Sequence, residues 1–97
     1  EEIIEVVCDK FGITIPQILS KERTMELVVP RQMAMFISHK FTPLGLKVIA
    51  PKFNKTHATI LNGVKQFQKQ MDVDQNLRAS LNEVLERLGF TMNDIKD

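Results

Sequence analysis

Apolar residues recur at helical spacing along most of this 97-residue chain, and this periodicity limits its fold more than any other feature. Residues three or four positions apart share one face of a helix, so the pattern predicts helices that bury one face together. The pattern is interrupted at residues that typically end or begin helices: Gly12, Asn54, Asp74 and Gly89. A weak alternation typical of a strand occurs only around residues 27–29. We therefore expect a small all-α domain that spans residues 1–97.

The interruptions divide the chain into segments of unequal length. The expected segments are a helix over 2–11, a short turn over 14–19, a polar connector over 20–24, a helix from Pro30 to Phe41, an apolar segment over 44–53, a helix over 56–70, a helix from 74 to 89, and a last turn over 91–94. Proline favours the first position of a helix, which is why the second long helix is expected to begin at Pro30. On that helix, Arg31, Gln32 and Lys40 are expected to reach solvent.

The segments over 44–53 and 56–70 form a short helix, a tight turn and a longer helix with a polar start. This succession is typical of a helix-turn-helix unit. The side chains of the longer helix that are expected to face the interior are Ile60, Leu61, Val64, Phe67 and Met71.

Charge is distributed unevenly along the chain. From Leu27 to Met71 there are seven lysines and arginines and no aspartate or glutamate, although the whole chain carries a net charge of +1. The segments before and after this stretch each hold three bases and six acids, which sum to −3. A concentrated positive field attracts polyanions. Because the acid-free stretch contains the helix-turn-helix pattern, the sequence predicts contact with DNA, with a helix in the major groove and lysines at the phosphates.

Other kinds of chemistry have little support. One cysteine and two histidines at unrelated spacings are too few ligands for a metal site, and no glycine-rich phosphate loop is present. Cys8 and a histidine could meet only in space, and no feature of the sequence supports such a nucleophile. We expect no enzymatic activity, no cofactor and no metal. Cys8 is expected to be a small buried side chain, and a single cysteine is typical of a reducing compartment.

No apolar run reaches the roughly 18 residues that cross a bilayer, so we expect a cytoplasmic protein without a membrane span. Since the chain starts within a helical pattern and without methionine, it is expected to be a piece of a longer protein.

Two motifs in the chain resemble the signatures of a known family. The first comprises Ser20-Lys21, Arg23 and Pro30-Arg31-Gln32-Met33-Ala34-Met35, and the second comprises Leu46, Ile49 and Phe53 followed by His57 and Thr59-Ile60-Leu61. Together they resemble the C-terminal DNA-binding domain of DnaA, the bacterial replication-initiator family, from about Ile3 to Met71. The resemblance implies an all-helical helix-turn-helix domain, related to the Trp-repressor type. It also implies double-stranded DNA as the partner, at a short asymmetric site called the DnaA box.

The resemblance also implies roles for individual residues. Arg23 would reach the minor groove, Arg31 and Gln32 would contact phosphates, and His57 and Thr59 would lie at the major groove. The full set of residues that we expect at the DNA is Arg23, Arg31, Gln32, His39, Leu46, Lys47, Lys55, Thr56, His57 and Thr59.

The second motif departs from the family pattern. The family usually has Gly-Gly-Arg-Asp-His-Thr-Thr where this chain has the shorter Asn54-Lys55-Thr56-His57-Ala58-Thr59. Thr56 stands in place of a base-reading aspartate, Ala58 in place of the first threonine, and Lys47 in place of a proline near the bases. Losing two base contacts lowers discrimination by about 2–6 kcal/mol, against a gap between specific and non-specific binding of about 4–10 kcal/mol.

These departures leave two functional interpretations. The first is binding of duplex DNA with altered or relaxed sequence preference, because the positive charge survives the substitutions. The alternative is a protein-interaction module that has kept the fold and lost specific DNA recognition.

Overall fold

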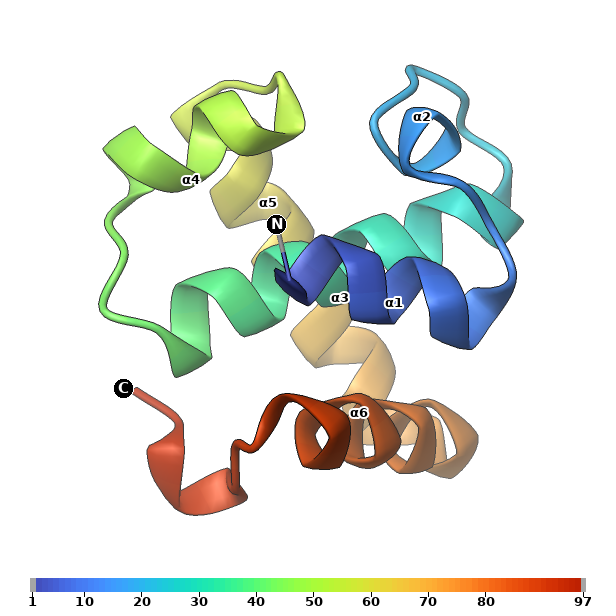
Figure 1. Ribbon diagram of the computed structural model, residues 1–97, viewed down its shortest axis with the longest axis vertical. Helices are drawn as coiled ribbons and strands as arrows, with labels where there is room; N and C mark the ends of the chain where they lie inside the picture. The colour runs from blue at the N-terminus through green and yellow to red at the C-terminus, as the bar shows by residue number, and fades with distance from the viewer. Residues whose placement is uncertain (1, 97) are drawn as a thin grey trace.

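The computed structural model describes residues 2–96, which form six α-helices and one 3-10 turn (Figure 1). The elements are α1 (Glu2–Phe11), α2 (Ile15–Ile18), α3 (Met25–Phe41), α4 (Leu46–Phe53), α5 (His57–Val73), α6 (Gln75–Leu88) and η1 (Met92–Asp94). The described part of the chain contains no strand. The prediction of an all-α domain is confirmed.

The central element is α3, which α1 covers on one side and α5 on the other (Figure 1). Its buried residues do not form one stripe but surround the helix, as is typical of a helix inside a core. They are Leu27, Pro30, Arg31, Met33, Ala34, Met35, Phe36, Ile37, Ser38 and Phe41. Phe36 is fully buried, and its ring centroid lies 5.1 Å from that of Phe67 on α5. The core is therefore built around α3.

The start of α3 differs from the sequence-based expectation. The helix begins at Met25, so Pro30 lies inside it, and residues 27–29 are helical rather than extended. The carbonyl of Thr24 accepts the first hydrogen bonds, from the amides of Leu27 at 3.0 Å and Val28 at 2.9 Å. A proline inside a helix removes one backbone hydrogen bond. Here tertiary packing outweighs that local preference, because Leu27 and Pro30 are both buried.

The helix-turn-helix unit consists of α4, a three-residue connection and α5. Asn54 ends α4 with a φ of 56°, in the left-handed region where asparagine is the usual substitute for glycine. Thr56 begins α5, since its hydroxyl accepts a hydrogen bond from the amide of Thr59 at 3.2 Å. The predicted helix-turn-helix is confirmed. Asn54 adopts the left-handed turn conformation at the place where the resembled family usually has glycines.

Two residues of α5 show which of its faces packs against α3 and which faces solvent. Leu61, expected to face the interior, is 37% exposed. It follows the buried Ile60 by one residue, hence by about 100° around the helix, which places it outside the buried stripe. Gly63 faces α3 so closely that a Cβ atom there would lie 2.7 Å from Sδ of Met35. Gly63 therefore leaves room for the side chain of Met35 to pack directly on α5.

The end of the molecule opposite α2 and α4 is closed by α6 and η1 (Figure 1). As predicted, Asp74 caps α6 by accepting the amide of Leu77 at 3.1 Å, and Gly89 ends it with a φ of 82°. Ion pairs of Lys10 with Glu83 and of Arg87 with Asp9 join α6 to α1. None of the described helices has the length and apolar character needed to cross a membrane.

Candidate nucleic-acid interface

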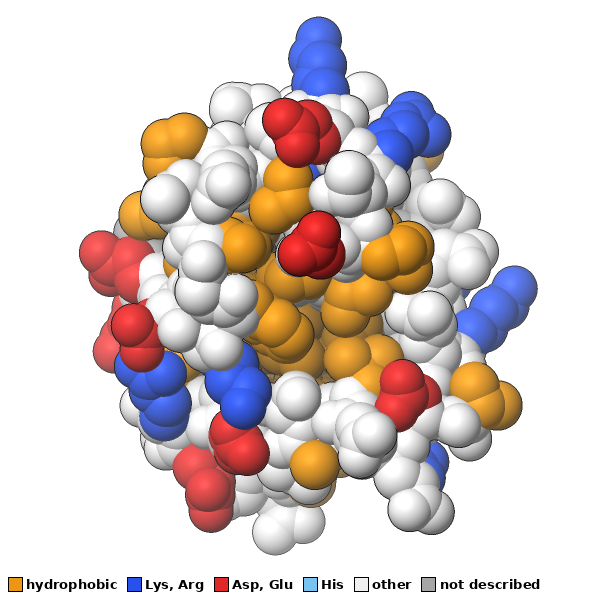
Figure 2. All heavy atoms as spheres, turned by 90° about the vertical axis from the view of Figure 1, so that its right-hand side faces the viewer, with side chains coloured by type: hydrophobic (Ala, Val, Ile, Leu, Met, Phe, Trp, Pro, Cys, Tyr) orange, Lys and Arg blue, Asp and Glu red, His pale blue; other side chains and the backbone are white. Residues whose placement is uncertain are grey.

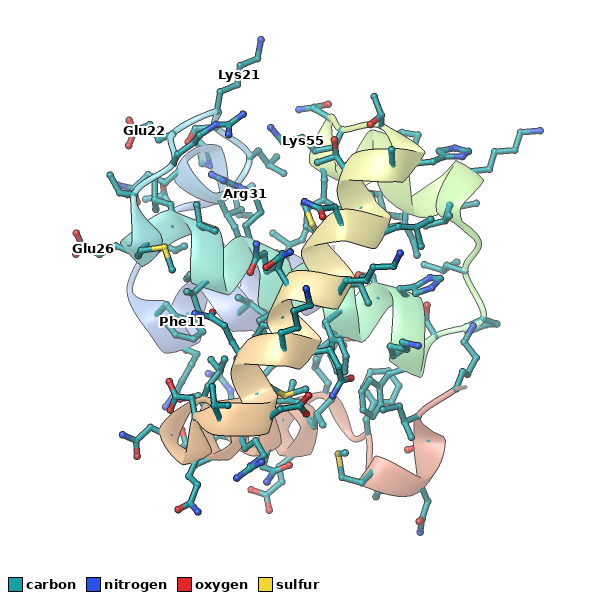
Figure 3. The ribbon with its side chains drawn as sticks, turned by 180° about the vertical axis from the view of Figure 1, so that it is seen from behind. Phe11, Lys21, Glu22, Glu26, Arg31 and Lys55 are labelled. Atoms are coloured by element: carbon teal, nitrogen blue, oxygen red, sulfur yellow. The ribbon has the colours of Figure 1, made fainter. Side chains whose placement is uncertain are left out.

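An open cavity of about 830 Å³ lies between the polar connector over 20–24, the N-terminal half of α3 and the first turns of α5. Figure 3 shows Lys55, in the connection between α4 and α5, pointing toward Arg31 and toward the connector that carries Lys21. The lining also includes Met35 of α3 and Gly63 of α5, which lie against each other. The cavity therefore joins segments that are far apart in the sequence.

Four basic side chains surround this cavity: Lys21, Arg23, Arg31 and Lys55. Their proximity affects the ionisation of Lys55. Partial burial lowers the pKa of its ammonium group, and the positive charges of Arg31, Lys21 and Arg23 lower it further. Four like charges at one site create a local positive potential that a bound anion would relieve. We refer to these four residues as the basic cluster.

The basic cluster draws on only part of the acid-free stretch. Arg31 and Lys55 come from it, whereas Lys21 and Arg23 precede it. The other lysines of the stretch do not line the cavity: Lys40, Lys47, Lys52, Lys65 and Lys69. Lys40, for example, lies nine residues beyond Arg31 on α3, or about 14 Å along the helix axis.

One face of the molecule has no comparable group of bases at its centre. Figure 2 shows that this centre is hydrophobic, with scattered acidic side chains, while the Lys and Arg side chains of the face stand mostly toward the rim. The bases of the acid-free stretch are thus gathered at the cavity only in part.

The hydroxyls of Thr56 and Thr59 lie together at the start of α5, with their oxygens 3.0 Å apart. Both residues line the cavity, and Asn62 extends this polar edge one turn further. His57 is exposed but does not line the cavity. Two positions along a helix correspond to about 200° of rotation, so His57 and Thr59 point to different sides of α5. The two residues expected at the major groove thus share one end of the helix but not one face.

Arg31 does not reach solvent as expected, because its side chain is only 7% exposed. Its guanidinium donates hydrogen bonds from Nε to the carbonyl of Ile18 at 2.6 Å and from Nη1 to that of Glu22 at 3.0 Å. A longer one runs from Nη2 to the carbonyl of Gln17, at 3.4 Å. Burial lowers the pKa of Arg31, and the charge of Glu22 opposes that effect. The neighbouring Gln32 is half-buried and lines the cavity.

Three other predicted residues lie away from the cavity: His39, Leu46 and Lys47. Leu46 and Lys47 begin α4, and Lys47 is exposed. His39 lies in the last turns of α3, and its Nδ1 atom is buried without a hydrogen-bond partner among the described residues. The structure therefore gathers Arg23, Arg31, Gln32, Lys55, Thr56 and Thr59 and leaves the other four predicted residues outside.

The environment of His39 predicts a dependence of stability on pH. Burial lowers its pKa below the ordinary 6.5, and the nearby charges of Lys40 and Lys96 lower it further. The unfolded chain therefore binds this proton more readily, so the free energy of unfolding should fall as the pH drops through about 6.5. We expect urea denaturation to show a larger loss of stability between about pH 7.5 and about pH 5.5 for the parent chain than for His39→Gln. Equal losses in the two proteins would contradict this.

Sequence reasoning missed several lining residues. Lys21 could have been found, because it precedes Arg23 by two residues in the same polar connector. Asn62 could also have been found, because it follows Thr59 by three residues and so shares its helix face. Met25 and Val28 gave no such signal, since their positions depend on α3 beginning before Pro30.

Comparison with known proteins adds independent information. Residues 1–66 match the family model described as bacterial dnaA protein helix-turn-helix. Over 89 residues the chain is 36% identical to the chromosomal replication initiator protein DnaA of Geobacter sp. (strain M21), covering 91% of this chain and 19% of that protein. It is 39% identical over 83 residues to DnaA of Ehrlichia ruminantium (strain Gardel), covering 84% and 18%. For DnaA of Bacteroides thetaiotaomicron the identity is 35% over 86 residues, covering 87% and 18%. The chain spans about a fifth of the length of these relatives.

Proposed function

Because this chain belongs to the bacterial DnaA helix-turn-helix family, we propose that it binds double-stranded DNA as the DNA-binding part of an initiator-like protein. The observation that carries the proposal is the basic cluster around one cavity, beside the first turns of α5. Phosphate contacts from Lys and Arg supply most of the affinity of such proteins for a duplex. The bacterial chromosome lies in the cytoplasm, and the proposal places this chain there too.

The cavity suggests how the duplex docks. The first turns of α5 enter the major groove, as the second helix of a helix-turn-helix does. Arg23, on the connector at the other side of the cavity, reaches the adjacent minor groove, as the family resemblance implies. One phosphate backbone separates a major groove from the neighbouring minor groove. That backbone therefore passes over the cavity, between Lys21 and Arg23 on one side and Lys55 on the other.

The sequence preference of this chain is proposed to be relaxed relative to the family box. At the position of the family's base-reading aspartate, the hydroxyl of Thr56 already accepts the amide of Thr59. Ala58 has only a methyl group, which can contact the methyl group of thymine but cannot form a hydrogen bond with a base. Phosphate contacts thus supply a larger share of the binding free energy than base contacts.

A fluorescence-anisotropy titration with a short labelled duplex tests the proposal. Three positive charges at the duplex, those of Lys21 and Lys55 at phosphates and that of Arg23 in the adjacent minor groove, together neutralise about three phosphate charges, so affinity should fall at least about 40-fold between about 50 mM and about 200 mM salt. The fall arises because each contact releases condensed counterions from the DNA. Absence of binding at the lower salt concentration, or an affinity independent of salt, would contradict DNA binding and favour a protein-interaction module.

The same assay measures sequence preference when unlabelled duplexes compete for the protein. Relaxed recognition predicts that a duplex of unrelated sequence competes almost as well as one carrying a DnaA box. A difference of about 10³-fold or more is typical of specific binding, and that result would show that recognition of the box survives.

A further inference from the structure

We propose that Arg31 is a positioning residue: it holds the connector that carries Lys21 and Arg23 in the place where both can reach the DNA. This inference rests on the proposed function, but it assigns Arg31 a different task from the phosphate contact that the family resemblance implies. The side chain is 7% exposed, whereas a phosphate contact needs guanidinium hydrogens directed outward.

The hydrogen bonds of Arg31 all lead to one backbone region. The acceptors are the carbonyls of Gln17 and Ile18, the last two residues of α2, and that of Glu22 in the connector. A helix as short as α2 has little stability of its own, and carbonyls at a helix end lack partners within the helix. Arg31 supplies such a partner mainly to Ile18, because the carbonyl of Gln17 also accepts hydrogen bonds from the amide and hydroxyl of Ser20. The donor side chain comes from α3, the most buried of the described helices. It therefore ties α2 and the connector to the core.

The position of Glu22 explains why this tie affects the basic cluster. Glu22 stands between Lys21 and Arg23, and the connector over 20–24 has neither helical nor strand structure. Fixing the carbonyl of Glu22 at 3.0 Å from Arg31 fixes the backbone from which both basic side chains extend. Without this hydrogen bond the connector must be ordered when DNA binds, which costs conformational entropy.

The planar guanidinium suits this task better than an ammonium group would. Arginine presents five N–H donors in a rigid fork, whereas lysine offers a compact point charge. Nε and Nη1 reach acceptors that lie four residues apart in the sequence, at Ile18 and Glu22. A lysine at this position keeps the positive charge but cannot form that divergent pair of bonds. Arg31→Lys therefore removes the hydrogen bonds that hold the connector and leaves the positive charge of residue 31 in place.

The experiment is a double-mutant cycle on duplex affinity. The proteins are the parent chain, Arg31→Lys, the pair Lys21→Ala with Arg23→Ala, and the combination of all three changes. If Arg31 acts through the connector, Arg31→Lys weakens binding in the parent chain and has little further effect once Lys21 and Arg23 are gone, because coupled residues are not additive. An equal fold-loss in both backgrounds, or no loss in the parent chain, would overturn the inference.

Gln32→Ala provides the matched control in the same cycle. Gln32 adjoins Arg31 and lines the cavity, but no hydrogen bond from its side chain to the connector occurs among the described residues. Its effect should be additive with the loss of Lys21 and Arg23. If Gln32→Ala couples as strongly as Arg31→Lys, the coupling is a general property of the cavity and the specific role of Arg31 is refuted.

Hydrogen exchange without DNA separates this inference from the proposed function. Arg31→Lys should accelerate amide exchange within residues 19–24 by at least about tenfold at Leu19, Ser20 and Glu22, whose amides donate hydrogen bonds, given the strength of hydrogen bonds to charged groups. Exchange in α5 and α6 should stay at the parent rate. Unchanged exchange at 19–24 would overturn the inference even if DNA binding is intact. Failure of the parent chain to bind a duplex would instead refute the proposed function. It would also refute the role of Arg31 in DNA binding, whether or not Arg31→Lys changes the hydrogen exchange.

Discussion

Replacing Lys21, Arg23 and Lys55 together by alanine is expected to lower duplex affinity about 500-fold at about 0.1 M salt. Each lost positive charge that neutralises a phosphate charge removes about 0.9 from the slope of log affinity against log salt concentration, so the slope should become less steep by about 2.7. Anisotropy titrations at several salt concentrations measure both quantities. The expected loss is large because the three side chains line one cavity, over which the proposed docking places a single phosphate backbone.

A matched control removes the same amount of charge elsewhere. Lys10→Ala, Arg87→Ala and Lys96→Ala change the net charge equally, but none of these residues lines the cavity. Lys10 and Arg87 already pair with Glu83 and Asp9. The control should keep most of the affinity and nearly the whole salt slope. If it loses as much affinity as the first variant, binding follows the net charge of the molecule and the cavity has no special role.

Phe36→Ala is expected to lower the free energy of unfolding by about 3–5 kcal/mol. The ring is fully buried in the centre of α3 and lies against Phe67 and Phe41, with centroid distances of 5.1 and 6.1 Å. Its loss leaves a cavity where α3 and α5 meet. Small domains are stable by only about 5–15 kcal/mol, so a large part of the total would be lost. Urea denaturation measures the change.

Phe36→Leu serves as the comparison for this variant. Leucine retains much of the apolar volume, so the loss should be clearly smaller than for alanine. A loss below about 1 kcal/mol for Phe36→Ala would show that the core is not centred on α3. The three-residue basic variant should leave stability nearly unchanged, since exposed charges contribute little to it. The Phe36 variants are thus expected to change the free energy of unfolding, and the three-residue basic variant is expected to change only the affinity for DNA.

The sequence was sufficient to predict those helices whose ends have local signals. Gly12 follows the end of α1, and Asp74 and Gly89 bound α6, because capping chemistry depends only on residues close in the sequence. The start of α3 could not be predicted in this way. Pro30 is locally a starting residue, and only the burial of the segment before it, in contacts with distant residues, makes a helix there favourable.

The candidate site could be predicted only in part, for the same reason. The lysines near α5 were visible as an acid-free stretch, but charge in sequence does not show which bases meet in space. Lys21 and Arg23 join the cavity because α3 brings the connector beside Lys55, more than thirty residues away. The helical pattern predicted that Arg31 reaches solvent, and the family resemblance implied a phosphate contact, whereas α3 is surrounded by the core.

The placement of α6 and η1 at the end opposite α2 and α4 limits how many duplexes one copy can hold. Residues 72–96 contain five acids and three bases, and of these bases Arg87 is paired with Asp9 while Arg78 donates to the carbonyl of Met71. A second phosphate backbone meets net repulsion there. Under the proposed function, this end of the molecule is therefore not expected to bind a second duplex, and a duplex close to it is expected to be held by another copy of the chain.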